Sequence, residues 1–141
     1  MKETTELLNI LKNAKDMDSL DSYLSSLDDR HPESLSSYLK QIIKEKAVKP
    51  SEIIRKSRIE RTYFYQILNG RKNPGRDKII AIALALELSL EETQRMLEIS
   101  KEGVLYAKSK RDSILIFAIN RRYSLIDTNE LLDQHRESEL K

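Results

Sequence analysis

The chain has 141 residues, a length that suits one domain, or a small domain with arms. This excludes a large enzyme barrel, which needs about 250 residues, but allows a hydrophobic core without disulfide bonds. Hydrophobic residues make up 39% and charged residues 34%, so the composition is polar without being that of a disordered chain. With 3 glycines, 3 prolines and no cysteine, the sequence favours helices over a turn-rich β-sandwich and excludes a disulfide framework.

Charge is unevenly distributed along the chain. The formal net charge is −4 over residues 1–34, +8 over residues 35–80 and −2 over residues 81–141. A basic block inside a near-neutral chain indicates either a surface that faces a polyanion or an ordinary solvated helical surface. Charges scattered through the first residues predict no signal peptide, and no apolar run reaches the roughly 18 residues of a membrane span. We therefore expect a cytoplasmic protein.

Residues 1–33 are predicted to form an acidic helical arm. Leucines recur at helical spacing over residues 4–14 and again over residues 20–27, and Pro32 closes the segment. Ser34 then precedes an apolar face over residues 35–43, an arrangement typical of a capped helix.

Four further helices are predicted between residues 50 and 100. Pro50 suits the first turn of a short helix over 50–57, and a second short helix over 61–69 ends at Gly70, which accepts positive φ. The most hydrophobic helix is predicted over 76–87, and the capping box at Ser89–Glu92 opens the next, which runs to about residue 100.

Two helices are predicted in the C-terminal part. A connector over residues 101–110 leads to a strongly apolar helix containing Ile114–Ile119, and Ser124 is placed to cap the last helix. Residues 135–141 are expected to fray. Because no segment alternates with a period of two for long, the predicted fold class is all-α.

The helix predicted over 61–69 has one apolar and one polar side. On a helical wheel Phe64, Ile67 and Leu68 share the side that must be buried. The opposite side carries side chains that can read base edges, because Arg suits guanine, Gln or Asn suits adenine, and Thr suits the thymine methyl group. Those side chains are Arg61, Thr62, Tyr65, Gln66 and Asn69.

These residues resemble those of a known family. The recognition helix ending in ILNG at Ile67–Gly70, the basic turn with proline at Arg71–Pro74 and the apolar helix Ile79–Leu86 are similar to the Xre type of helix-turn-helix regulator, the Cro-like or lambda-repressor-like group. The resemblance covers about residues 35–99. The segment over 110–132 also resembles the C-terminal extension of some small regulators of this group.

The resemblance implies a five-helix DNA-binding domain over 34–100, followed by a C-terminal extension over 101–141. Helix 50–57 would lie across the DNA backbone and helix 61–69 would enter the major groove. The base-contacting residues would be Glu60, Arg61, Thr62, Tyr65 and Gln66. The phosphate-contacting residues would be Ser51, Tyr63, Asn69, Arg71, Lys72, Asn73 and Arg76.

Two residues depart from the family pattern. The family often has a small residue where this chain has Ile54, and a glycine where it has Arg58. Arg58 would have to adopt a turn conformation that glycine takes more easily.

Catalytic chemistry has little support in the sequence. His31 and His135 are far apart, and without cysteines they make a poor set of metal ligands. The glycines are isolated, so no phosphate-binding loop is present. We expect no enzymatic activity, no cofactor and no metal, and nothing in the sequence indicates a small-molecule ligand.

The sequence therefore predicts a regulator that binds duplex DNA sequence-specifically and acts by occupying an operator. A homodimer is expected, with the last two helices as the interface, because Ile114–Ile119 is apolar almost all round. Alternatively, this helix packs wholly within its own chain. The alternative function is a protein-interaction module on a helix-turn-helix scaffold, with weak or lost DNA binding.

Overall fold

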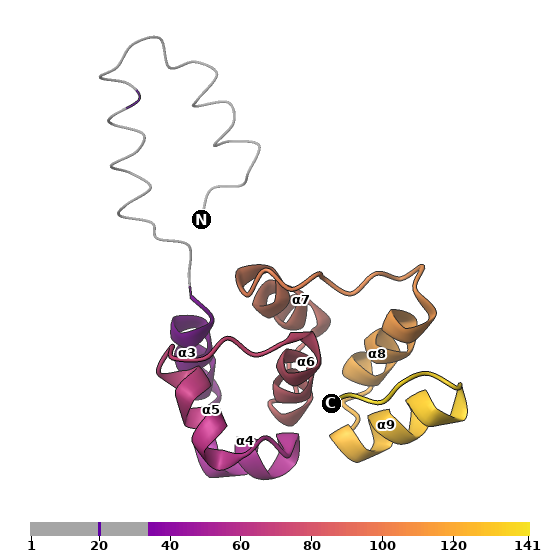
Figure 1. Ribbon diagram of the computed structural model, residues 1–141, viewed down its shortest axis with the longest axis horizontal. Helices are drawn as coiled ribbons and strands as arrows, with labels where there is room; N and C mark the ends of the chain where they lie inside the picture. Colours follow the sequence, from indigo (N-terminus) through magenta and orange to yellow (C-terminus); the bar gives the residue numbers. More distant parts are fainter. Residues whose placement is uncertain (1–19, 21–33) are drawn as a thin grey trace. The chain divides into compact units, whose positions relative to one another are not determined.

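All regular elements in the described part of the chain are α-helices (Figure 1), as predicted. A computed structural model describes Leu20 and residues 34–141. The helices are α3 (Leu35–Lys46), α4 (Pro50–Ser57), α5 (Arg61–Leu68), α6 (Arg76–Ala85), α7 (Leu90–Ile99), α8 (Lys110–Asn120) and α9 (Leu125–Gln134). In this part of the chain no helix has the length and hydrophobicity needed to cross a lipid bilayer. The predicted arm over 1–33 lies outside the described residues, apart from Leu20.

The helices begin where the predicted caps stand. Ser34 Oγ accepts a hydrogen bond from the Ser37 N–H at 3.1 Å, and Ser124 Oγ accepts one from the Asp127 N–H at 3.1 Å. Ser89 and Glu92 form the complete capping box at the start of α7. Each cap satisfies N–H groups that have no partner inside the helix, which is why short polar side chains at these positions fix the helix starts.

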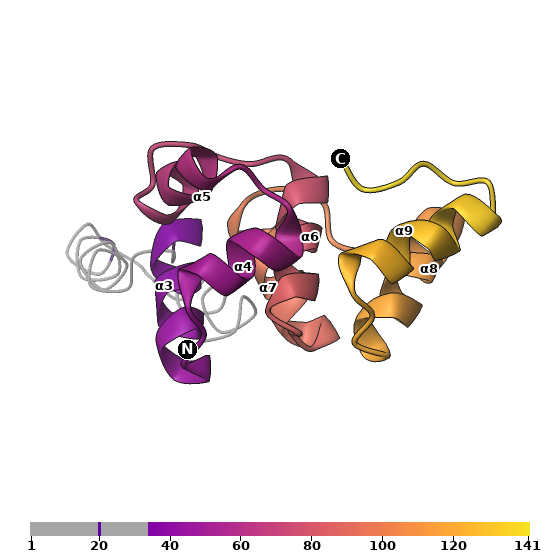
Figure 2. The same cartoon turned by 90° about the horizontal axis from the view of Figure 1, so that it is seen from below.

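The centre of the fold is α6, which packs against α4, α7 and α9. Both views place it between the group α3–α5 and the pair α8 and α9 (Figures 1 and 2). Every residue over 79–85 is buried, so the whole circumference of α6 is covered. A helix that is hydrophobic all round needs neighbours on all sides. The helix ends at Ala85, two residues earlier than predicted, since Glu87 adopts left-handed backbone geometry with φ 53°.

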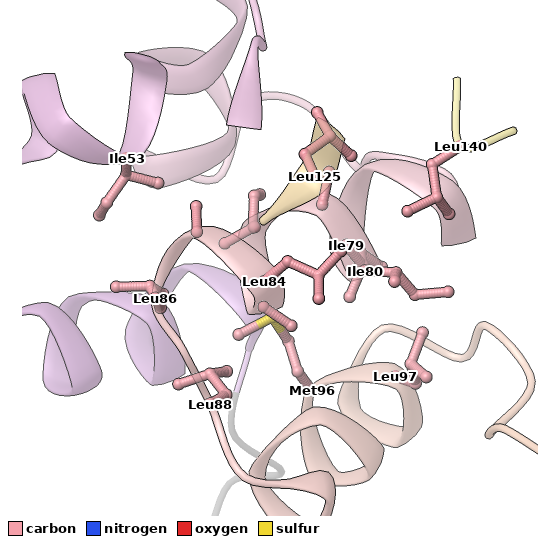
Figure 3. Packing of buried hydrophobic residues seen from close by; sticks show 14 of the residues in the cluster. Ile53, Ile79, Ile80, Leu84, Leu86, Leu88, Met96, Leu97, Leu125 and Leu140 are labelled. Atoms are coloured by element: carbon pink, nitrogen blue, oxygen red, sulfur yellow. The ribbon is translucent and has the colours of Figure 1, made fainter. Parts of the chain in front are cut away.

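The C-terminal extension is part of the same compact unit as α3–α7. Leu125 and Leu140 join the central cluster, and Figure 3 shows them lying over the helix that carries Ile79, Ile80 and Leu84. The prediction of a fraying tail is therefore wrong. The Leu140 side chain is only 8% exposed, and its N–H donates to Asn129 Oδ1 at 2.8 Å. This one apolar side chain anchors a segment that is otherwise polar in sequence.

Two crossed arginine–aspartate pairs join the starts of α6 and α8. Arg76 donates to both carboxylate oxygens of Asp112, at 2.9 and 2.8 Å. In the reverse sense, Arg111 donates to both oxygens of Asp77 at 3.1 Å. Arg111 also donates to the carbonyl oxygens of Ser138 and Glu139, which holds the C-terminal segment in place. Consecutive residues on one helix thus pair with consecutive residues on the other, and we call this arrangement the α6–α8 junction.

Asp112 is the most buried member of the junction, with 6% of its surface exposed. Hydrogen bonds from the Arg76 guanidinium lower the pKa of this carboxyl below its ordinary value, although burial acts in the opposite direction. The Tyr106 N–H donates to the same carboxylate at 2.9 Å and adds to the lowering. Asp112 is therefore held ionised inside the protein.

Candidate nucleic-acid interface

The turn between α4 and α5 has tight geometry even though it contains no glycine. Arg58 adopts left-handed geometry with φ 58° and ψ 22°, and its N–H donates to the Ile54 carbonyl oxygen at 3.0 Å. Ile59 is buried directly after the turn, and Ile54 packs partly buried against the core. Both departures from the family pattern are thus accommodated. The left-handed conformation costs a non-glycine residue roughly 1–2 kcal/mol, which the anchoring of Ile59 has to offset.

One face of α5 is fixed by burial. Phe64 is fully buried and Ile67 is 1% exposed, as the helical wheel predicted. Leu68 and Tyr63 pack partly buried against the same core, and the neighbouring helix is α3. Tyr63 is half-buried with the Lys78 ammonium 5.8 Å from its ring centre. The buried face therefore sets how α5 is rotated, and with it which side chains point outward.

The opposite face of α5 is polar and accessible. Arg61, Thr62 and Tyr65 are exposed, and Gln66 is half-buried. The Arg61 guanidinium lies 5.7 Å from the Tyr65 ring centre, so the two form a cation–π pair. Within residues 34–141 the side chains of Thr62 and Gln66 make no hydrogen bond. Their donors and acceptors remain available to a ligand.

Glu60, by contrast, is used by the helix itself. Its two carboxylate oxygens accept hydrogen bonds from the N–H groups of Thr62 and Tyr63, each at 3.2 Å. Such a carboxylate satisfies unpaired N–H groups and complements the positive end of the helix. We therefore treat Glu60 as the cap of α5 and leave it out of the proposed base-contacting set.

The basic loop after α5 is held in place by its backbone. Gly70, with φ 82°, donates to the Ile67 carbonyl oxygen at 3.1 Å, and Arg71 donates to that of Gln66 at 2.8 Å. This pattern is the Schellman motif, and it requires the positive φ that glycine provides. Asn69 caps the helix, with its Oδ1 accepting the Arg71 N–H at 3.1 Å.

The polar side chains around this loop are open to solvent. Arg71, Lys72 and Asn73 are exposed, as is Ser51 in the first turn of α4. Across the described residues, neither Arg71 nor Lys72 has an ion-pair partner. The loop thus carries two unneutralised positive charges next to the polar face of α5.

Arg76 has a different role from the one predicted. Besides its two bonds to Asp112, it donates from Nε to the Gly103 carbonyl oxygen at 2.8 Å and from Nη2 to that of Val104 at 2.9 Å. These contacts occupy most of the donors of the guanidinium and direct it toward α8. Because a committed guanidinium has little left to offer a phosphate, we leave Arg76 out of the proposed phosphate-contacting set.

Four cations lie around one cavity at the end of α4: Arg55, Lys56, Arg58 and Arg122. None of them was predicted from the sequence to belong to a binding site. Arg122 lies more than 60 residues from α4 in sequence, so no local pattern could have grouped them.

Comparison with known proteins identified no relative of this chain. No known protein family, curated protein or solved structure matches this chain. The resemblance to the Xre group therefore rests on the sequence features given above.

Proposed function

We propose that this protein is a transcriptional regulator that binds duplex DNA sequence-specifically, with a lambda-repressor-like arrangement of α3–α7 and with α5 as the recognition helix. The observation that supports this most strongly is the pairing of an accessible polar face on α5 with the exposed cations Arg71 and Lys72 directly after it. Base edges are read by hydrogen-bonding side chains on a helix in the major groove, while neighbouring cations position the protein on phosphates.

Each outward side chain of α5 has a role in this proposal. Arg61 would contact guanine and Gln66 would contact adenine, each through two hydrogen bonds. Thr62 would pack on a thymine methyl group, and Tyr65 would support Arg61 through their stacking. Phosphates would be contacted by Arg71 and Lys72, together with Ser51, Tyr63, Asn69 and Asn73.

A homodimer belongs to the proposal as its second part. Domains of this kind bind two half-sites about 34–36 Å apart, one on each protomer. Most of the apolar segment Ile114–Ile119 packs within its own chain, where Leu115 and Ile119 are buried. Phe117 on α8 is 42% exposed and is the apolar side chain of this segment left for a second copy. Sedimentation of the full chain at high micromolar concentration tests this, and a monomer there would refute a dimer.

Binding to a random duplex at low and at higher salt tests the function. Phosphate contacts release counterions, so affinity should fall steeply as salt rises. Lys108→Gln is the control for substitutions of Arg71 or Lys72, because it removes an exposed cation from the connector before α8, away from the proposed interface. It should leave binding unchanged. Failure of the chain to bind duplex DNA at low salt would favour the protein-interaction module instead.

Selection of bound sequences from a random duplex pool tests specificity. We expect a defined sequence motif to emerge, and substitutions on α5 should change its composition. A pool that stays random while binding persists would contradict sequence-specific recognition.

A further inference from the structure

A cavity of about 440 Å³ lies where the C-terminal end of α4 faces the turn between α8 and α9. Its apolar lining comes from Leu84 and Ala85 of α6 and from Leu125 and Ile126 of α9. Ligand pockets for small molecules span about 300–1,000 Å³ and combine apolar walls with a few polar groups, so this cavity falls at the lower end of that range.

Four cations surround the same cavity. Arg55, Lys56 and Arg58 come from the end of α4, and Arg122 comes from the turn after α8. Their side chains have no ion-pair partner anywhere in residues 34–141. Arg76 and Arg111 at the α6–α8 junction, by contrast, are each paired with an aspartate. Like charges grouped without counter-charges favour an anion between them.

Other charges around the cavity reduce this attraction. Glu87 is the carboxylate of the lining, and the C-terminal ends of α4, α6 and α8 meet here. Each helix end carries roughly half a negative charge, while the start of α9 contributes roughly half a positive one. An adjoining cavity shares Arg58 with this one and is lined by Glu130, Asp133 and Glu139, whose negative charges also oppose the cations.

The backbone places these charges at some cost. Arg58 and Arg122 both adopt left-handed geometry, with φ 58° and 55°, a conformation in which glycine is the usual residue. Each instead carries a long cationic side chain at the edge of one cavity. Ala47, Glu87, Lys101 and Arg136 adopt the same geometry at other helix ends, so it belongs to the way helices end in this chain.

We propose that this cavity binds a small organic anion that carries an apolar ring, with the ring against Leu125 and Ile126 and the anionic group among the four cations. The volume suits a ligand of one or two rings, and the mixed lining selects against both a bare inorganic anion and a neutral ring. The proposal does not depend on DNA binding, because it concerns the cavity alone.

Calorimetric titration of the full chain with 1-naphthyl phosphate tests the proposal. Inorganic phosphate and 1-naphthol serve as the two halves of that ligand. We expect 1-naphthyl phosphate to bind at least tenfold more tightly than either half. No binding of 1-naphthyl phosphate, or equal affinity for it and inorganic phosphate, would overturn the proposal.

Matched variants locate the site. The double variant Arg55→Gln, Lys56→Gln should weaken binding of 1-naphthyl phosphate at least tenfold. The control Lys40→Gln, Lys44→Gln removes the same amount of charge from exposed positions on α3, and should leave affinity unchanged. Equal losses in both double variants would show general charge attraction and would overturn the proposal.

A third variant, Ile126→Asp, places a carboxylate at the rim of the cavity. An acidic residue in the first turn of a helix is favourable, so α9 should stay folded while the anion is repelled. We expect at least a tenfold loss of 1-naphthyl phosphate binding with unchanged helicity by circular dichroism. Unchanged binding in this variant would place the ligand elsewhere and refute the assignment.

Discussion

The α6–α8 junction and the outer surface of α5 both carry arginines but use them differently. At the junction Arg76 and Arg111 are each held by two hydrogen bonds to an aspartate. On the α5 side, Arg71 has no ion-pair partner among the described residues, and Arg61 only stacks on Tyr65. Paired charges fix the position of one helix on another, whereas unpaired exposed charges keep their donors for a ligand.

Burial explains why the two regions differ. A carboxylate as buried as Asp112 must be paired and hydrogen-bonded, since an isolated buried charge is very unfavourable. Exposed cations such as Arg71 and Lys72 are solvated and need no partner for stability. A stable fold alone therefore requires the first arrangement, whereas the second leaves charges available for binding.

The largest effect on stability is expected from a substitution on the buried face of α5, and a substitution on its open face serves as the comparison. Phe64→Ala should cost about 3–5 kcal/mol of the free energy of unfolding, because it removes a fully buried ring. Tyr65→Ala should cost about 1 kcal/mol or less, since Tyr65 is 38% exposed and mainly loses its edge contact with Phe64. Urea unfolding measures both. Similar losses would mean that α5 is rotated from the position described.

The junction should respond next most strongly. Asp112→Asn should cost about 3 kcal/mol of the free energy of unfolding, because it leaves the Arg76 guanidinium without its counter-charge. Urea unfolding at pH 7 measures this, and Asp133→Asn is a suitable control because Asp133 is exposed on α9.

The pH dependence identifies the charge as the cause. The pKa of Asp112 is lowered in the folded protein, so its stabilisation is complete above the unfolded pKa of about 3.9. It is lost as the pH falls through the lower, folded value. The loss of stability below about pH 4 should therefore be smaller in Asp112→Asn than in the parent chain. Parallel pH profiles would show that the pair does not stabilise through its charge.

On the open face, Arg61→Ala and Gln66→Ala should each reduce discrimination between specific and non-specific duplexes by about 1–3 kcal/mol. Neither should change stability by more than about 0.5 kcal/mol, because neither side chain is buried in the core. Competition binding with the selected and a scrambled duplex measures the discrimination. Unchanged preference in both variants would remove α5 as the reading element.

The smallest effect is expected in the loop after α5. Arg71→Ala and Lys72→Ala should weaken binding to all sequences alike and lower the slope of log affinity against log salt by roughly one unit each. Binding at several salt concentrations measures the slope. A change in sequence preference without a change in slope would reverse the assignment of base and phosphate contacts.

The sequence by itself determined the helices of the described part and most of their starts, but not that of α8, which begins at Lys110 inside the predicted connector. Local signals can be recognised without knowing the fold, because they act through nearby hydrogen bonds and backbone geometry. They are the serine caps, the proline at the start of α4 and the glycine after α5. The buried side of α5 followed equally from its periodicity, because Phe64 and Ile67 lie one turn apart. The exposure of the predicted base-contacting side chains followed from the same rotation.

Only the tertiary structure decided which charges are paired. Arg76 and Arg71 stand in one basic stretch, yet Asp112, 36 residues further along the chain, engages the first and not the second. The sequence likewise did not reveal that Leu140 packs on the core or that four cations surround one cavity. The residues brought together in each case are distant in the chain. Local hydrogen bonds depend on neighbouring residues. Ion pairs and cavities between helices depend instead on which helices meet, and the periodicity of the sequence does not show which helices meet.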